Sequence, residues 1–163
     1  GHLQTNKIKD LLKHGVSCIQ SLDRLDLAEK LHQRLLFENK TMEVLIQVNT
    51  SFEESKFGVS PDEAIALTKQ VAQLSTLKIK GLMTIGLLSA EVEKVRKCFR
   101  LLKQIQQQII ALQIPNVNMQ ELSMGMSGDL EAAIAEGATI VRVGTAIFGT
   151  RPTPDSEYWN ENK

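Results

Sequence analysis

The sequence predicts an α/β fold of the partial TIM-type (β/α)8 barrel class, with about five C-terminal βα units of the eight present. Five β-rich segments begin near residues 16, 42, 78, 119 and 139, and a helical pattern separates each from the next. This alternation is typical of a parallel sheet with right-handed crossovers. A closed barrel needs eight such units, usually in about 250 residues. The last residues are polar and rich in proline, so we expect the three other strands to precede residue 1.

The first two strand–helix units follow from short-range patterns. A short strand is expected over residues 16–20, and Ser21 can cap the helix that follows it. Leucines and alanines recur in that helix at three- and four-residue steps, which indicates one buried face. A second strand is expected over residues 42–49, and it leads into a polar loop over residues 50–58. An open, doubly wound sheet remains an alternative, since βα repeats alone do not distinguish it from a barrel.

The middle of the chain carries the clearest helix signals. Ser60 can cap a helix, a proline suits its first turn, and Glu63 completes a capping box. A strand is expected over residues 78–85. The longest helix is expected over about residues 90–112, with Pro115 beyond its end. Its predicted apolar stripe consists of Val92, Val95, Phe99, Leu102, Ile105 and Ile109.

The C-terminal part of the chain contains the same pattern twice: a strand, then small residues, then the start of a helix. Ser127 precedes one helical segment, and Gly144 and Thr145 precede the next. A helix N-terminus offers unpaired N–H donors and the positive end of a dipole, so it suits an anion such as phosphate. In (β/α)8 barrels this site commonly follows the last two strands. The sequence therefore predicts a phosphorylated ligand here, with Ser123 as a weaker contact.

Arg142 is the most specific single candidate. It lies in the last strand, and alternation places it on the face opposite Val141 and Val143. A guanidinium inside a barrel is costly unless it is paired. From the residues alone, a rim arginine paired with a carboxylate is the leading interpretation, and a ligand contact is the alternative. Asn49 and Thr84 end two middle strands, where polar side chains often face a ligand or support a loop.

Composition excludes several other classes of function. Nineteen basic and nineteen acidic residues cancel, so no overall charge favours nucleic acid or an anionic membrane. Aromatic residues make up only 4% of the chain, which argues against a surface that stacks bases. No apolar run is long enough for a membrane helix, and no residues have convincing metal-ligand spacing. Cys18 and Cys98 are expected to be free thiols, which fits the cytoplasm.

Five segments together carry a resemblance to a known family: GHLQTNK, LIQVNTSFEESKFGV, KGLMTIG, LSMGMSGD and VRVGTAIFGTR, in that order along the chain. They resemble the pyridoxal phosphate homeostasis protein family, whose members are single-domain barrels similar to the N-terminal domain of alanine racemase. The resemblance implies a cytoplasmic protein that holds and hands over pyridoxal 5'-phosphate without catalysis of its own. It also implies that residues 1–151 are the C-terminal portion of the barrel and that residues 152–163 are a polar tail.

The resemblance also implies roles for individual residues. The family arginine that matches Arg142 contacts the pyridine nitrogen, and an always-charged donor there keeps that nitrogen unprotonated. His2 would lie over the cofactor ring. The family lysine that forms the imine lies on the first strand, which this chain lacks, so binding is expected to be weak or non-covalent. The predicted cofactor-binding residues are Ser123, Ser127, Arg142, Gly144, Thr145, His2 and Asn49. No catalytic residue is expected.

Two enzyme functions remain as alternatives. An amino-acid racemase on this scaffold needs a second, β-rich domain and a catalytic tyrosine, whereas the only tyrosine here is Tyr158 in the tail. Another phosphate-binding barrel enzyme would need acid or base groups at the strand ends, and these ends offer no carboxylate. Full-length family members are expected to be monomeric. A chain with five strands leaves two unpaired sheet edges, so this one could self-associate.

Overall fold

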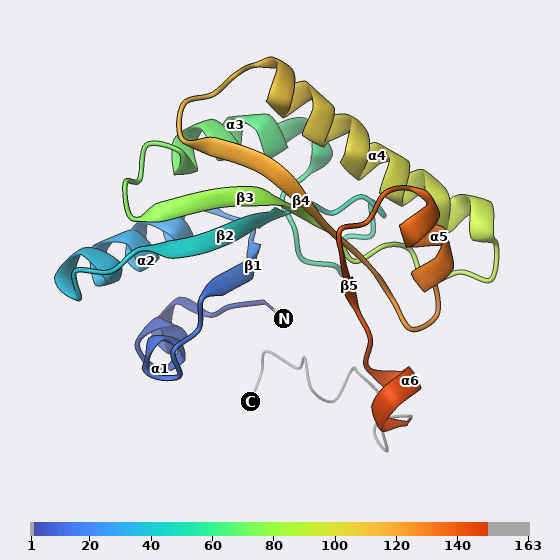
Figure 1. Cartoon of the computed structure of the whole chain (residues 1–163), viewed down its shortest axis with the longest axis horizontal. Coiled ribbons are helices and arrows are strands. Elements are labelled where there is room, and N and C mark those ends of the chain that lie inside the picture. Colours follow the sequence, from blue (N-terminus) through green and yellow to red (C-terminus); the bar gives the residue numbers. More distant parts are fainter. Residues whose placement is uncertain (1, 150–163) are drawn as a thin grey trace.

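The computed structural model describes residues 2–149, which form one five-stranded parallel sheet with strand order β1-β2-β3-β4-β5 (Figure 1). The strands are β1 (Cys18–Leu22), β2 (Met42–Gln47), β3 (Leu77–Met83), β4 (Val117–Met126) and β5 (Ile140–Arg142). Spatial order follows chain order without the reversal that a doubly wound sheet requires. The partial-barrel prediction is therefore confirmed, and the doubly wound alternative is wrong.

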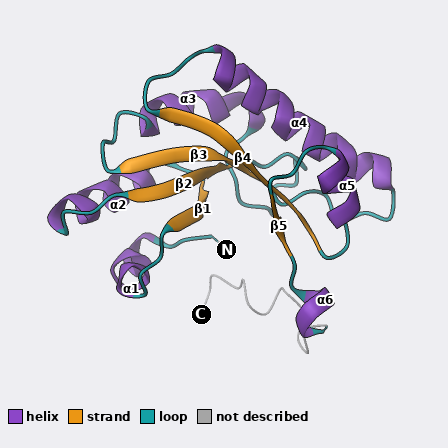
Figure 2. Cartoon of the chain, in the orientation of Figure 1, coloured by secondary structure: helices purple, strands orange, loops and turns teal. Residues whose placement is uncertain are grey.

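Helices connect the strands and cover one face of the sheet (Figure 2). They are η1 (Thr5–Lys7), α1 (Ile8–Lys13), α2 (Leu25–Phe37), η2 (Pro61–Glu63), α3 (Ala64–Val71), α4 (Val92–Ala111), α5 (Leu130–Ala135) and α6 (Thr145–Phe148). Each of α2, α3 and α4 contacts the next helix along the chain. Because these crossovers all lie on one side, the sheet curves and its other face is concave, as in a barrel wall.

The helices are held by the apolar stripes that the sequence predicts. In α4, Phe99 and Leu102 are fully buried, and Val95, Ile105 and Ile109 are at most 3% exposed. Residues at this spacing share one helix face, so α4 lies flat against the sheet. The predicted stripe is wrong at its first residue, because Val92 is 59% exposed at the start of the helix.

Two predicted caps differ from the structure. β1 continues through Leu22, so Ser21 is a buried strand residue, and α2 begins only at Leu25 after Arg24. The hydroxyl of Ser60 donates to the Glu63 carboxylate at 2.8 Å, and its oxygen accepts no bond from a backbone N–H of the helix. In both places a competing contact replaced the expected cap: pairing with β2 in the first, a direct side-chain bond in the second.

Gly81 determines how closely strands β3 and β4 approach each other. The β2–β3 and β3–β4 registers both shift at Gly81, which has φ +159°. A Cβ built there would lie 1.9 Å from the carbonyl oxygen of Glu121 in β4. Only a residue without a side chain allows β3 and β4 to come this close.

The predicted free thiols, Cys18 and Cys98, are confirmed. No helix among the described residues is both long enough and apolar enough to cross a membrane. The predicted tail, residues 152–163, lies outside the described residues and includes Tyr158. The division at residue 151 therefore stays a prediction.

Candidate functional site

The turns that follow β4 and β5 lie side by side at the carboxyl edge of the sheet. The backbone nitrogens of Gly144 and Ala146 both donate to Ser127 Oγ at 3.2 Å. Ser127 was expected to head α5, but Asp129 occupies the N-cap position of that helix and accepts a bond from Met126 N. The Ser127 hydroxyl instead meets the first N–H groups of α6. The two predicted turns therefore form one cluster of small polar groups.

The cluster is open where a ligand would need space. A Cβ built at Gly128 or at Gly144 would meet no atom within 4 Å. A pocket of about 360 Å³ adjoins it, between the start of α4 and the start of α5, and Ser127 and Asp129 are among its lining residues. Both glycines thus leave room for an anionic group beside the backbone N–H donors.

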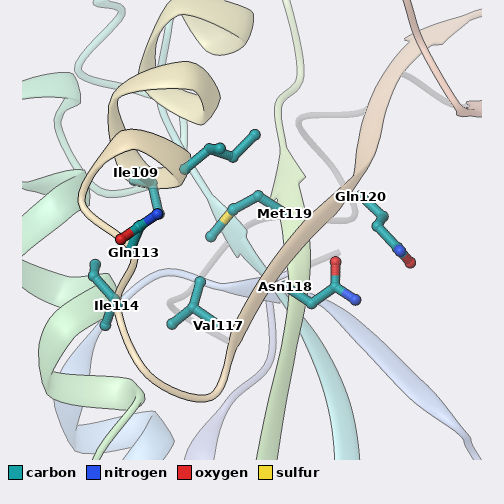
Figure 3. Close-up of a pocket in the computed structure, with 8 residues that line it drawn as sticks. Ile109, Gln113, Ile114, Val117, Asn118, Met119 and Gln120 are labelled. Carbon is teal, nitrogen blue, oxygen red and sulfur yellow. The ribbon is translucent and has the colours of Figure 1, made fainter.

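A second pocket, of about 370 Å³, lies at the start of β4 (Figure 3). Ile109, Ile114 and Val117 line it together with amide side chains, Gln113 among them. It contains none of the predicted site residues. Volume alone therefore does not identify the site, and we base the assignment on the polar groups at the carboxyl edge.

Arg142 reaches across the concave face. Its Nη1 donates to Ser123 Oγ and its Nη2 donates to the Thr84 carbonyl oxygen, both at 2.8 Å. Burial lowers the pKa of Arg142, and the carboxylate of Asp129 opposes that shift by attraction. The guanidinium nonetheless keeps its charge at neutral pH. Among the described residues no carboxylate forms an ion pair with it, so the interpretation of a rim arginine paired with a carboxylate is not supported.

A buried polar network extends from Arg142 to three other strands. Ser123 Oγ donates to Gln20 Oε1 at 2.8 Å, and the Thr84 hydroxyl donates to the Val48 carbonyl oxygen at 2.8 Å. The Thr50 hydroxyl lies 2.9 Å from that of Thr84. Ser123 and Thr84 are fully buried. Sequence reasoning missed Gln20, although its polar side chain in the middle of a short strand was a signal.

His2 lies in a separate cluster, beside the carboxyl end of β1 and the loop after β2. Its Nδ1 is 3.2 Å from Asp23 Oδ2, and its ring stacks on Phe57 with centroids 3.9 Å apart. Arg24 Nη1 donates to the same carboxylate at 2.8 Å. His2 is therefore a structured residue rather than a solvated end of the chain. Asp23 and Phe57 had no signal in the sequence, because only the fold brings them to His2.

Asn49 supports the loop that follows β2. Its Nδ2 donates to the carbonyl oxygens of Glu53 and Lys56 at 2.8 and 3.2 Å. Its Oδ1 accepts a bond from Ser51. Lys56 Nζ donates to the Gly86 carbonyl oxygen at 3.0 Å and so ties this loop to the next one. Both amide hydrogens of Asn49 are thus used inside the loop.

The structure accordingly joins Arg142 to Ser123 and Gly144 to Ser127, with Thr145 next to Gly144 at the start of α6. It leaves His2 and Asn49 in contacts of their own. The strands contain two lysines, both in β3: Lys80 Nζ lies 3.4 Å from the Glu43 carboxylate, and Lys78 Nζ donates to the Ser75 carbonyl oxygen at 3.1 Å. Among residues 2–149 no group of three or more His, Cys, Asp or Glu side chains could hold a metal ion.

Comparisons with known proteins agree with this architecture. The family model described as alanine racemase, N-terminal domain, matches residues 1–152. The pyridoxal phosphate homeostasis protein of Aquifex aeolicus is 44% identical over 151 residues, which are 93% of this chain and 65% of that protein. The protein of the same name from Haemophilus influenzae is 38% identical, over 93% of this chain and 63% of its own length. The chain thus spans slightly less than two thirds of these relatives.

Solved structures give the same picture. An unknown protein from Bifidobacterium adolescentis is 46% identical with a TM-score of 0.87, over 91% of this chain and 58% of that one. PipY of Synechococcus elongatus, solved with pyridoxal phosphate bound, is 33% identical with a TM-score of 0.80, over 91% of this chain and 68% of its own. Alanine racemase of Clostridium difficile has a TM-score of 0.74 at 16% identity, over 95% and 40% of the two chains, so it shares the fold.

Proposed function

The chain belongs to the alanine racemase N-terminal domain family, and from that premise we propose that it binds pyridoxal 5'-phosphate in the cytoplasm as a carrier rather than a catalyst. The observation that carries the proposal is Arg142, a charged group held on the concave face by hydrogen bonds to Ser123 and Thr84. An interior guanidinium without a carboxylate partner suits an anionic or acceptor ligand. The names of the curated relatives, and the cofactor bound to PipY, support the same ligand.

The residues at the carboxyl edge fit the two ends of this cofactor. The N–H groups of Gly144 and Ala146 donate to Ser127 Oγ in this structure, and a phosphate oxygen that took the place of this hydroxyl would accept from the same two groups. The hydroxyls of Ser127 and Thr145 would then bind the phosphate in the space beside the glycines. Arg142 would donate to the pyridine nitrogen. When bound, the cofactor supplies an electron-accepting ring.

A carrier role follows from the chemistry of Arg142. A permanent donor at the ring nitrogen holds that nitrogen unprotonated, which weakens electron withdrawal by the ring. The same residue would therefore secure the cofactor and keep it from reacting. His2 and Asn49 stay in the proposal as groups near the site, since their contacts order the segments that border it.

Equilibrium titration of the chain with pyridoxal phosphate, followed by visible absorbance, tests the proposal. Arg142→Ala and Ser127→Ala should each weaken binding by about tenfold, because each removes a hydrogen bond to a charged or polar ligand group. Arg34→Ala and Ser75→Ala are matched controls: Arg34 pairs with Glu38 on α2, and Ser75 lies outside the cluster. Unchanged affinity in both site variants would remove the assignment.

Borohydride reduction of the mixture, followed by peptide mass analysis, tests whether binding is covalent. We expect no lysine to be labelled selectively, since the two strand lysines, Lys78 and Lys80, are held by the Ser75 carbonyl oxygen and the Glu43 carboxylate. Selective labelling of one lysine would overturn the non-covalent part of the proposal.

A further inference from the structure

We propose that Gln20 is a positioning residue for Arg142 and that it acts through the hydroxyl of Ser123. The inference rests on the proposed function, since Arg142 is the residue assigned there to the cofactor ring. Gln20 lies in β1 and Ser123 in β4, and these strands are not neighbours in the sheet. Their hydrogen bond therefore spans the concave face and joins one edge strand to the arginine of the other edge strand.

The direction of each proton in this chain of bonds is determined. A guanidinium only donates, so Ser123 Oγ accepts from Arg142 Nη1. The single hydroxyl proton of Ser123 is then free for Gln20 Oε1, which is 2.8 Å away and only accepts. With the amide reversed, Ser123 would accept twice, and its own proton would be buried without a partner, since Ser123 is fully buried. That arrangement is costly, so Gln20 presents its oxygen.

The hydrogen bond of the other terminal nitrogen of Arg142, Nη2, does not depend on a hydroxyl group that can rotate. Arg142 Nη2 donates to the Thr84 carbonyl oxygen, which is part of the backbone at the end of β3. The Thr84 hydroxyl donates to Val48, so the neighbouring hydroxyl of Thr50 must donate to Thr84. Thr84 is thus fixed on all sides. Only the bond from Arg142 Nη1 to Ser123 depends on a hydroxyl group that can rotate. Gln20 fixes the orientation of that hydroxyl by accepting its proton.

The same logic changes the role of Ser123. Its hydroxyl donates to Gln20 and accepts from Arg142, so Ser123 would not contact the cofactor itself. It would act on the cofactor ring by holding Arg142 in place. Gln20 also keeps its amide nitrogen pointing away from Ser123. Within residues 2–149, the side chain of Gln20 forms a hydrogen bond only through its oxygen.

Nuclear magnetic resonance of ¹⁵N-arginine in the ligand-free protein tests the inference. In the wild type, the two terminal nitrogens of Arg142 should give separate signals because rotation of the held guanidinium is slow. Gln20→Met should average these signals, and Gln20→Glu, which still accepts from Ser123, should keep them apart. Gln120→Met, the same change at an exposed site of β4, is the matched control and should behave as the wild type.

The cofactor titration provides the second readout. Gln20→Met should weaken binding of pyridoxal phosphate about five- to tenfold, as expected for one hydrogen bond to a charged group. Ser123→Ala should do the same, and the double variant should be no weaker than either single one, because both act on one arm of Arg142. Additive losses would mean that Gln20 does not act through Ser123.

The two proposals can fail separately. If the wild-type chain binds no pyridoxal phosphate while Gln20→Met averages the Arg142 signals, the proposed function fails and the positioning role stands. If Gln20→Met leaves the signals separate while Ser123→Ala averages them, the positioning role is overturned whatever the chain binds. Thermal melts of each variant show whether it is folded, and Gln20→Glu provides the decisive comparison if Gln20→Met is not.

Discussion

The β3–α4 unit and the β5–α6 unit stand at opposite extremes of packing. Seven residues of α4 are buried, among them Phe99 at 0% exposure. In contrast, no residue of the three-residue β5 or the four-residue α6 is buried, and Phe148 is 86% exposed. Yet β5 and its turn carry Arg142 and Gly144. Arg142 and Gly144 therefore lie on elements without a buried residue, where hydrogen bonds replace apolar contacts. The stability of the chain and its binding of a ligand can thus be perturbed separately.

The largest test of this comparison is a pair of matched phenylalanine truncations. Phe99→Ala should lower the free energy of unfolding by about 3–5 kcal/mol, because it leaves a cavity between α4 and the sheet. Phe148→Ala should change it by less than about 0.5 kcal/mol, since the ring is exposed. Urea unfolding followed by circular dichroism measures both. Equal losses would show that α6 is packed as firmly as α4.

A pair of glycine substitutions separates stability from binding. Gly81→Ala should cost about 3 kcal/mol, since the new methyl group meets the Glu121 carbonyl oxygen and the strands must part. Gly144→Ala meets no atom within 4 Å, so its cost should stay below about 1 kcal/mol. It should instead weaken pyridoxal phosphate binding, because the methyl group enters the space proposed for the phosphate. A Gly144→Ala variant that binds pyridoxal phosphate as the wild type does would contradict the proposed phosphate site.

The smallest expected effect concerns the ion pairs that fasten α5 to α4. Arg96 donates to Glu136 at 2.6 Å, and this bond, with a second from Arg100, lowers the pKa of Glu136. The folded carboxyl thus releases its proton at lower pH than the unfolded one. The stabilisation is complete above about pH 4.3, the ordinary glutamate value, and is lost as pH falls through the lowered folded value.

Glu136→Gln should therefore reduce stability at pH 7 by less than about 1 kcal/mol. The difference from the wild type should shrink as the pH falls through the lowered pKa of folded Glu136, because the carboxyl group is then protonated in the folded and the unfolded chain alike. Thermal melts over that range measure it. A constant difference at every pH would show that the ion pairs contribute nothing.

Periodicity in the sequence was enough to predict the order of the strands and helices. It was not enough to predict contacts between residues that are distant in sequence. The apolar stripe of α4 is visible in the sequence because residues three and four apart share a face. The partner of Ser127 is not, since its hydroxyl meets α6 rather than its own helix only after β4 and β5 pair. Gln20 and Arg142 are 122 positions apart, and only the curvature of the sheet joins them through Ser123. Local patterns therefore located the site, and the fold determined which of its groups form hydrogen bonds with one another.

The uniform direction of the strands has an electrostatic consequence. Because every strand ends at the same edge, α2, α3, α4 and α5 all begin there. Each helix places the positive end of its dipole at that edge, and an acidic residue in the first turn of α2, α4 and α5, namely Asp26, Glu93 and Glu131, offsets part of it. The first turn of α6 carries no acidic residue, so a doubly charged ester would be drawn to that part of the rim. Added salt would weaken that attraction by screening, even for a chain with zero formal charge.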